Sequence, residues 1–263
     1  MELTYSRYLK IDELTELQQL YSKPKEHDEM LFIIIHQTYE LWFKQIIHEI
    51  DYLVKRLQEN DVMTAIKTQK RINTILKVIV HQVDILETMT PLEFLSFRDY
   101  LHSASGFQSY QFRELEFMLG NKNAKVLERF AKSSKAYKSV YRRYNEKTLW
   151  DYFLKFLTLN DYPVPQDVLN RDLTKPIEPN KKIQELLLNI YKFSPIIVTL
   201  CELLVDFDEG MQEWRYRHVK MVERTIGSKT GTGGSEGVKY LQGTLFKPLF
   251  QDLWIIRSEF KND

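Results

Sequence analysis

This sequence has almost no cysteine, no excess charge of either sign and no long apolar run, and each absence excludes a class of protein. Its single cysteine, Cys201, cannot form an internal disulfide bond, and one thiol is too few for a zinc ribbon, an iron–sulfur cluster or a CxxC redox motif. That usage fits a reducing compartment, so we expect a cytoplasmic protein. Lysine and arginine total 37 against 36 aspartates and glutamates, which indicates neither a nucleic-acid groove nor binding to an acidic membrane.

Apolar runs are too short to cross a membrane. The longest, from Met30 to Ile35, is far below the roughly 18 residues that a spanning helix requires. The N-terminal stretch is charged throughout, unlike a secretory leader. We therefore expect a protein that has no membrane partner and acts on a small molecule.

Glycine and proline are scarce as well, with nine and eight residues in 263, while apolar side chains recur at helical spacing over long segments. No segment shows the alternation of a convincing strand, and no period of roughly 20 to 50 residues repeats. Residues 1–263 are therefore predicted to form a single all-α domain, a helical bundle rather than a solenoid.

The spacing of apolar residues predicts five main helices, the first capped by Asp28 and the third opened by Pro91. Their expected ranges are 28–60, 63–88, 91–101, 107–119 and 196–226. Gly120 is expected to follow the fourth helix in a left-handed conformation. Residues 160–180 contain four prolines and are predicted to run over the surface.

Five of the nine glycines lie between Gly227 and Gly237, directly after the last of these helices. A P-loop is excluded because the lysine and the serine or threonine that should follow its last glycine are missing, and because the segment follows a helix rather than a strand. The dinucleotide fingerprint fails for the same topological reason. Two interpretations stay equally open: a loop that folds over a ligand, with Thr232 supplying a hydroxyl, and a flexible linker.

His218 lies on the helix before this loop and shares a face with mostly apolar side chains. They are Phe207, Met211, Trp214, Met221, Val222 and Thr225. A lone histidine in such a layer is more often a core residue than a ligand. The functional alternative is an axial haem ligand, because a neutral imidazole in an apolar slot suits porphyrin iron without a second metal-binding side chain.

His36 and Arg98 are two further polar residues beside aromatic side chains. His36 lies between Phe32 and Phe43 on the first long helix, and Arg98 follows Phe94 by one turn. Taken singly, His36 is better explained as a core residue and Arg98 as a salt-bridge partner, although a guanidinium beside an aromatic wall could also clamp a carboxylate. The six histidines include no HxxxH and no ExxH pair, which argues against zinc-protease and di-iron sites and leaves haem as the form of iron that one histidine can hold.

Several short motifs occur in one order along nearly the whole chain, and together they resemble the tryptophan 2,3-dioxygenase family. They are Tyr5-Ser-Arg-Tyr-Leu9, His27-Asp-Glu-Met-Leu-Phe-Ile-Ile-Ile-His-Gln-Thr38 with Glu40-Leu-Trp42, Phe97-Arg-Asp99, Ser105-Gly-Phe-Gln-Ser109, Leu119-Gly-Asn-Lys-Asn123, Trp214-Arg-Tyr-Arg-His218 and Gly231-Thr-Gly-Gly-Ser235. One such motif would be weak support, whereas the independent coincidence of all of them is not credible. The resemblance implies an all-α haem enzyme that opens the indole ring of L-tryptophan with O2 to give N-formylkynurenine.

The resemblance also implies roles for individual residues. His218 would be the axial ligand of haem b, His36 would hydrogen-bond the indole N–H, and Arg98 would clamp the substrate carboxylate. Thr232 would contact the ammonium and carboxylate groups of the substrate. The indole pocket would be lined by Phe32, Ile33, Ile34, Ile35 and Phe94.

Members of the family are homotetramers in which the N-terminal segment, here residues 1–20, reaches into a neighbouring subunit. The resemblance therefore implies that Tyr5, Tyr8 and Leu9 complete an adjacent subunit's pocket, and that monomers are inactive.

Two positions depart from the family's pattern. Phe94 stands where some members have tyrosine, and Glu236 places a negative charge in the glycine-rich loop 227–237, where many members have serine. The nearest alternative function is a broader indoleamine dioxygenase, against which Arg98 and Thr232 argue. A haem sensor and a purely structural helical scaffold are alternatives from other classes.

Overall fold

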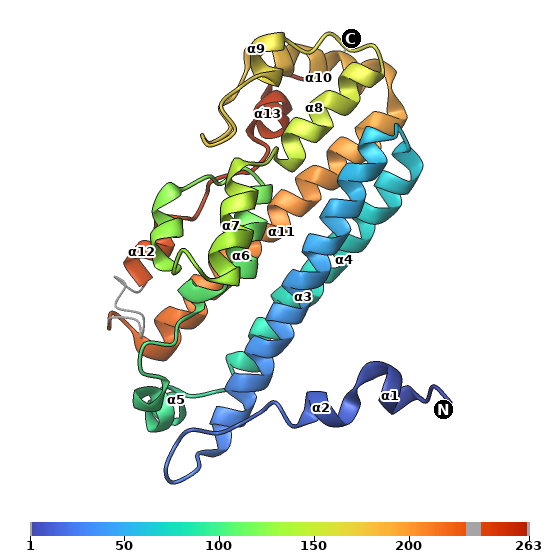
Figure 1. Ribbon diagram of the computed structural model, residues 1–263. Coiled ribbons are helices and arrows are strands. Elements are labelled where there is room, and N and C mark those ends of the chain that lie inside the picture. Colours follow the sequence, from blue (N-terminus) through green and yellow to red (C-terminus); the bar gives the residue numbers. More distant parts are fainter. Residues whose placement is uncertain (1, 230–237, 262–263) are drawn as a thin grey trace.

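The computed structural model describes residues 2–229 and 238–261, and every regular element in these two ranges is a helix (Figure 1). The all-α prediction is therefore confirmed for the described part of the chain. The longer elements are α3 (His27–Gln58), α4 (Val62–Leu86), α5 (Pro91–Arg98), α6 (Tyr110–Met118), α7 (Lys135–Asn145), α8 (Leu149–Leu159), α10 (Lys181–Phe193) and α11 (Pro195–Ile226). The shorter ones are α1 (Tyr5–Leu9), α2 (Ile11–Thr15), η1 (Asp99–Leu101), η2 (Gly106–Gln108), η3 (Ala124–Arg129), α9 (Gln166–Leu169), α12 (Val238–Gln242), α13 (Gln251–Ile255) and η4 (Ile256–Ser258).

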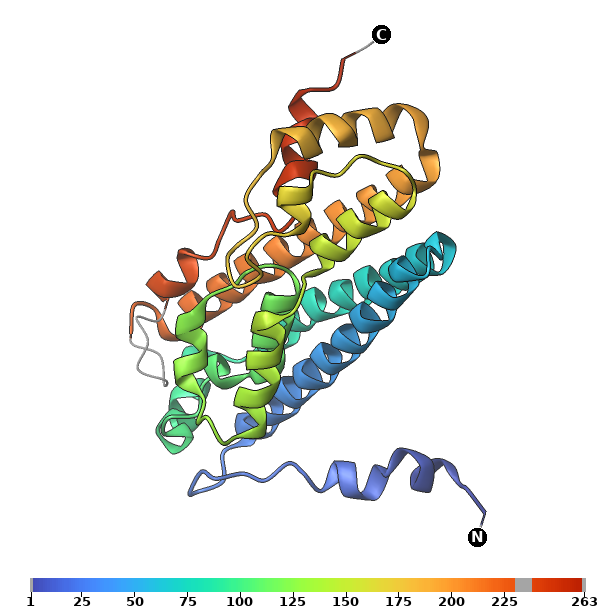
Figure 2. The same cartoon turned by 45° about the horizontal axis from the view of Figure 1, so that its top comes forward.

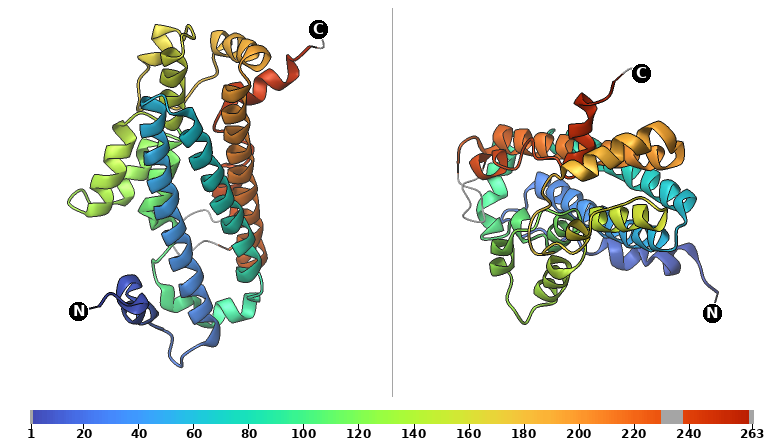
Figure 3. Two further views of the ribbon diagram at one scale, coloured as in Figure 1. Left: turned by 90° about the vertical axis from the view of Figure 1, so that its right-hand side faces the viewer. Right: turned by 90° about the horizontal axis from the view of Figure 1, so that it is seen from above.

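Three long helices form the axis of the bundle, with α4 packed along both α3 and α11 (Figure 1, Figure 3). A glycine permits part of this packing, because a Cβ atom on Gly210 of α11 would lie only 2.8 Å from the Cδ2 atom of Leu76 on α4. The missing side chain therefore lets the two helices approach closely, and this offsets the low helix propensity of glycine.

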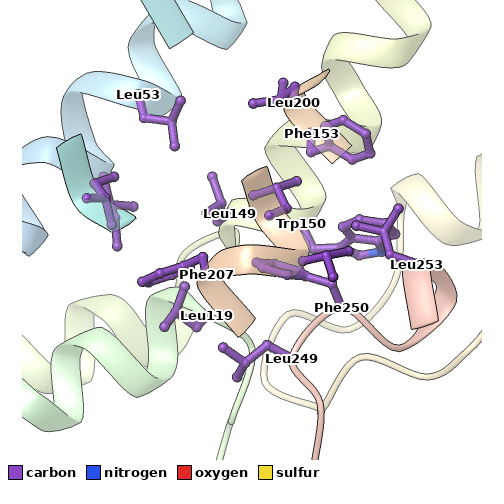
Figure 4. Close-up of a cluster of buried hydrophobic side chains, with 14 of the residues drawn as sticks. Leu53, Leu119, Leu149, Trp150, Phe153, Leu200, Phe207, Leu249, Phe250 and Leu253 are labelled. Atoms are coloured by element: carbon purple, nitrogen blue, oxygen red, sulfur yellow. The ribbon is translucent and has the colours of Figure 1, made fainter. Parts of the chain in front are cut away.

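The main hydrophobic core collects side chains from these three helices, from α6, α8 and α10, and from the C-terminal segment. Figure 4 shows a part of it in which Phe153 of α8, Phe207 of α11 and Phe250 of the C-terminal segment are fully buried. Removing rings of this size from water is the largest favourable contribution that such a bundle has, so the core fixes the course of α11.

Asp208 is a fully buried carboxylate within this core. One of its oxygens accepts hydrogen bonds from the backbone N–H groups of Leu249 and Phe250, at 2.7 and 3.0 Å, and from the indole N–H of Trp254 at 2.9 Å. Its other oxygen accepts from the Gln212 side chain at 3.1 Å. These bonds attach the C-terminal segment to α11, and they compensate for the burial that raises the pKa of Asp208.

The cap of the first long helix differs from the prediction. Asp28 is not a cap, because α3 already begins at His27 and Asp28 lies in its first turn. An aspartate does cap α4, where the carboxylate of Asp61 accepts from the backbone N–H of Thr64 at 3.1 Å. Pro91 occupies the first turn of α5 as predicted, after a capping box in which Thr90 and Glu93 bond each other's backbone.

The two predicted helices that follow are shorter than expected. α5 ends at Arg98 and passes into the 3-10 turn η1, and the range 107–119 is interrupted at Ser109. The hydroxyl of Ser109 accepts from the backbone N–H of Phe112 at 3.2 Å and so begins α6 as a new helix. Gly120 has a φ of 97° directly after α6, which confirms the prediction of a left-handed residue there.

Two members of the apolar period on α3 do not face inward. Leu41 is 53% exposed and Ile34 is 45% exposed, although both keep the helical spacing of the apolar residues in this segment. α3 packs against α4, α5, α6 and α8, and these helices leave Ile34 and Leu41 uncovered.

The N-terminal helices α1 and α2 bury no side chain at all. They lie beside one end of the bundle and extend away from it (Figure 1, Figure 2). Residues 160–180 run largely outside the core, as predicted, although they include the short helix α9 and the buried Val164. Among the described residues, no helix is both long and apolar enough to cross a membrane.

Candidate active site

A cavity of about 260 Å³ lies where α3, α5, α6 and α11 meet, and the turn η2 and the helix α12 add to its wall. Most of the described side chains that line it are apolar or aromatic. The polar exceptions include both His36 of α3 and His218 of α11, so two histidines 182 positions apart in the sequence share one cavity.

The imidazole of His36 is held in one tautomer. Its Nδ1 atom lies 2.7 Å from the carbonyl oxygen of Phe32, one turn earlier on α3, and since a carbonyl can only accept, Nδ1 must carry the proton. Burial lowers the pKa of His36, so the ring is neutral at pH 7. The Nε2 atom is consequently left as a hydrogen-bond acceptor. The Phe32 ring packs against the imidazole with its centroid 4.1 Å away.

His218 is also neutral, for a similar reason. Burial lowers its pKa to about 4, and the nearby His36 imidazole and the charged Arg113 guanidinium lower it further. Its ring stacks on the indole of Trp214 one turn earlier, with centroids 5.3 Å apart and planes 9° from parallel. A neutral, oriented imidazole can offer a nitrogen lone pair to a metal.

An aromatic cluster and one guanidinium form the wall near His36. The Phe94 ring lies 5.8 Å from that of Phe32 and 5.4 Å from that of Phe97, and Phe94 is only 8% exposed. Arg98 is half-buried and follows Phe94 by one turn of α5, so its side chain reaches the same cavity. A cation beside a dry aromatic wall is well suited to pair with a carboxylate.

The three isoleucines expected in the pocket lie elsewhere around α3. Ile35 is buried in a small cluster with Phe94, Ile33 is half-buried and Ile34 is exposed. None of the three belongs to the described residues that line the cavity. Their contribution to an indole pocket stays a prediction.

The other expected residues lie outside this cavity or outside the described ranges. Tyr5, Tyr8 and Leu9 are on α1 and are 76%, 71% and 41% exposed. Thr232 and Glu236 fall outside the described residues. The cavity therefore joins Phe32, His36, Phe94, Arg98 and His218, and it leaves the N-terminal trio apart from them.

Two buried charged residues of α6 also line the cavity, and no pattern in the sequence had indicated a site role for them. Arg113 and Glu116 line the cavity, are 8% and 5% exposed, and form an ion pair with each other. The turn before them also reaches the cavity through Ser105 and Gly106. The signal available in the sequence was that these charged residues lie among apolar and aromatic residues of a short helix.

Comparison with known proteins shows to which family the chain belongs. The family model described as tryptophan 2,3-dioxygenase matches residues 1–150 and 186–260. The chain belongs to the tryptophan 2,3-dioxygenase family. A tryptophan 2,3-dioxygenase of Herpetosiphon aurantiacus is 56% identical over 257 residues, covering 98% of both chains. Enzymes of the same name from Anaeromyxobacter sp. (strain K) and Myxococcus xanthus (strain DK1622) are 47% and 42% identical and cover 97% of this chain each, with 96% and 89% of their own lengths matched.

The tryptophan 2,3-dioxygenase family was the one that the sequence motifs resembled, and that prediction is confirmed. In this member of the family, no group of three or more histidine, cysteine, aspartate or glutamate side chains is placed to hold a bare metal ion within the described ranges. The neutral imidazole of His218 in a largely apolar cavity could instead bind iron that is already held by a macrocycle.

Proposed function

We propose that this protein is a haem-dependent dioxygenase that cleaves the C2–C3 bond of the indole ring of L-tryptophan, inserts both atoms of O2 and releases N-formylkynurenine. The observation that carries the proposal is the presence of two neutral imidazoles, His36 and His218, in one largely apolar cavity. Family membership supports the same reaction, because relatives that match nearly the whole chain are named for it.

The residues around His218 fit haem b. Its neutral imidazole would bind the iron. Nearby, the Nε1 atom of Trp214 and the Nε atom of Arg113 are buried without a hydrogen-bond partner among the described residues. The carboxylate groups of a haem would give these two donors the acceptors that they lack, which removes a desolvation penalty. Haem, when bound, supplies the iron chemistry that activates O2.

His36 would orient the substrate rather than remove a proton from it. Since Nδ1 already donates to the Phe32 carbonyl, Nε2 is the free acceptor, and the indole N–H is a matching donor. An indole N–H is too weak an acid to need deprotonation before the ring is attacked. A hydrogen bond at this position fixes the indole in the cavity, and such positioning lowers the barrier for the reaction.

Arg98 would bind the substrate carboxylate through a bidentate, charge-assisted pair beside Phe94. We assign Thr232 to the ammonium and carboxylate groups, and Phe32, Ile33, Ile34, Ile35 and Phe94 to the walls around the indole. The half-buried position of Arg98 and the aromatic cluster of Phe32 and Phe94 support this assignment.

We extend the proposal to a homotetramer in which residues 1–20 reach a neighbouring subunit. Helices α1 and α2 contain no buried residue, and Tyr5 and Tyr8 expose most of their surface, which supports a role for them on another surface. A cytoplasmic location belongs to the same proposal and is supported by the free thiol of Cys201.

The direct test mixes the reduced, haem-loaded protein with O2 and L-tryptophan and follows the absorbance of N-formylkynurenine. We expect product to accumulate over many turnovers, and none to form when O2 or reductant is omitted. A haem absorption band without any turnover would contradict the proposal and would indicate a haem sensor. Equal turnover of tryptophan and tryptamine would indicate a broader indoleamine dioxygenase.

A further inference from the structure

A buried carboxylate holds the base of the N-terminal segment. Glu29 lies in the first turn of α3 and is only 1% exposed. Its Oε1 atom accepts from the backbone N–H of Tyr21 at 2.8 Å. Its Oε2 atom accepts from the backbone N–H of Ser22 at 3.0 Å and also from the Ser22 hydroxyl. Both carboxylate oxygens are thus bound to the residues that lead from the N-terminal segment into the bundle.

The three donors keep Glu29 ionised. Burial alone would raise the pKa of Glu29, but the Ser22 hydroxyl and the two backbone N–H groups outweigh burial, and the pKa lies below its ordinary value. Hydrogen bonds to an ionised carboxylate are stronger than those between neutral groups. The first turn of a helix is also the positive end of its dipole, which favours a negative charge at this position. The attachment of Tyr21 and Ser22 to α3 is therefore strong.

The short loop between Ser22 and α3 is closed by further hydrogen bonds. The Ser22 hydroxyl, besides donating to Glu29, accepts from the backbone N–H of Glu26 at 2.9 Å. The Tyr100 hydroxyl of η1 donates to the carbonyl oxygen of Lys23 at 2.5 Å. The base of the N-terminal segment is therefore bonded both to α3 and to η1.

The attachment becomes weaker towards the N-terminus. The side-chain amide of Gln18 donates to the Gln37 side chain of α3 at 2.6 Å, and the Gln37 amide donates to the carbonyl oxygen of Leu17 at 3.3 Å. These bonds lie at the surface, where water competes for the same groups. α1 and α2 contain no buried residue and extend away from the bundle (Figure 1). The buried bonds of Glu29 are therefore the firmest attachment of residues 2–22.

We propose that Glu29 is a positioning residue, which fixes the direction in which the N-terminal segment leaves the bundle and so places Tyr5 and Tyr8 against the neighbouring subunit. The inference rests on the proposed function, in which residues 1–20 complete that subunit's pocket. A segment that is held at its base loses less conformational freedom when its tip is ordered on a partner, so it binds more tightly. Release of the base therefore weakens substrate binding in the neighbouring subunit and leaves the chemistry there unchanged.

The test is a double-mutant cycle on the haem-loaded protein, in which Glu29→Gln is combined with deletion of residues 2–10. Glu29→Gln places an amide NH2 group opposite an N–H donor and so breaks at least one of the bonds. We expect it to raise KM for L-tryptophan about three- to fivefold, less than the deletion does, and to change kcat by less than about twofold. In the truncated chain the same substitution should not raise KM further, because no tip is left to position.

Asp28→Asn is the matched control, because it removes the same charge from the first turn of α3 and leaves the bonds of Glu29 in place. It should not change KM. Trypsin cleavage after Lys25, followed by mass spectrometry, monitors the base without any turnover, and it should be faster in Glu29→Gln but not in Asp28→Asn. If Glu29→Gln fails to fold, Ser22→Ala removes only the hydroxyl bonds and should raise KM about twofold, again only when residues 2–10 are present.

The possible failures are distinct from one another. A deletion that raises KM while Glu29→Gln leaves it unchanged would overturn the positioning role and keep the shared site. An equal rise in KM from Glu29→Gln in the full-length and truncated chains would also overturn it, because Glu29 would then support its own subunit's site through α3. A deletion without any effect on KM would overturn the shared site of the proposed function, and this inference with it.

Discussion

The long helices α3 and α11 and the short N-terminal helices α1 and α2 differ in how their side chains are held. α3 and α11 are packed along the bundle and present His36 and His218 from a rigid frame. α1 and α2 contain no buried residue, and Tyr5 and Tyr8 expose 76% and 71% of their surface. The difference indicates that groups for the chemistry lie on the packed frame, whereas groups on the N-terminal segment gain a fixed position only against another surface.

The largest effect on activity is expected from substitution of His218, the residue proposed to hold the cofactor. His218→Ala should abolish stable haem binding and reduce turnover to the background rate, because no other histidine lies on α11 to replace the ligand. Haem content per chain, from the absorption spectrum of the purified variant, measures this. The matched control is His81→Ala, which alters an exposed histidine of α4 and should leave haem content unchanged. Normal haem content in His218→Ala would refute the axial assignment.

Substitution of Arg98 tests how the packed helices bind the substrate. Arg98→Ala should lower kcat/KM for L-tryptophan by about two to three orders of magnitude, because truncating one member of a buried charge pair typically costs roughly 2 to 5 kcal/mol. Arg98→Lys should recover only part of the loss, since an ammonium lacks the planar fork of the guanidinium.

Tryptamine provides the control for Arg98, because it keeps the indole and the amine but has no carboxylate. The variant should damage tryptophan turnover far more than any residual tryptamine turnover. Equal proportional losses for the two substrates would mean that Arg98 holds the haem or the fold.

His36 should have a smaller effect than Arg98. His36→Ser should keep its haem and lose about ten- to a hundredfold in turnover, the range expected for one orienting hydrogen bond. Steady-state kinetics and haem content measured on the same preparation test this. Complete loss of activity with intact substrate binding would show that His36 moves a proton.

The smallest effect is expected from the unpacked N-terminal segment. Deleting residues 2–10 should raise KM for tryptophan by about tenfold, the cost of losing a few contacts at an interface, while helical content and haem content change little. Far-UV circular dichroism measures the helical content, and substrate titration measures the affinity for tryptophan. Unaltered affinity in the truncated protein would exclude a shared site and would leave the segment without a role in the pocket.

The sequence predicts the long elements of this fold well because their signals are local. The uninterrupted apolar period of 196–226 corresponds to α11 within one residue at its start. The cap of α3 was predicted wrongly. Aspartate is a good capping residue, but it caps a helix only where it lies directly before the first turn, as Asp61 does at α4 and Asp28 does not at α3. Leu41 keeps the apolar period of α3 and is nevertheless exposed, because a period cannot show which side of a helix its neighbours cover.

The site was predictable to a different degree. The residues His36, Arg98 and His218 each favoured a structural interpretation when taken alone, and only the motifs reversed it. The helices that carry these residues meet in one cavity only in the folded chain, and the residue pattern on a single helix does not show this. Arg113 and Glu116 were missed because charged residues usually face water, and their mutual pairing, which allows burial, depends on how α6 is packed.

The buried carboxylate of Asp208 has a topological consequence. The chain runs from Asp208 along α11 past His218, leaves the helix after Ile226, and returns at Leu249 to the same aspartate. Hydrogen bonds thus close a ring that contains His218, the glycine-rich stretch and the cavity residues Leu241 and Thr244. A backbone cut between Ile226 and Val238 would open the ring at one point only, and the C-terminal piece would stay docked on α11 as a noncovalent subunit.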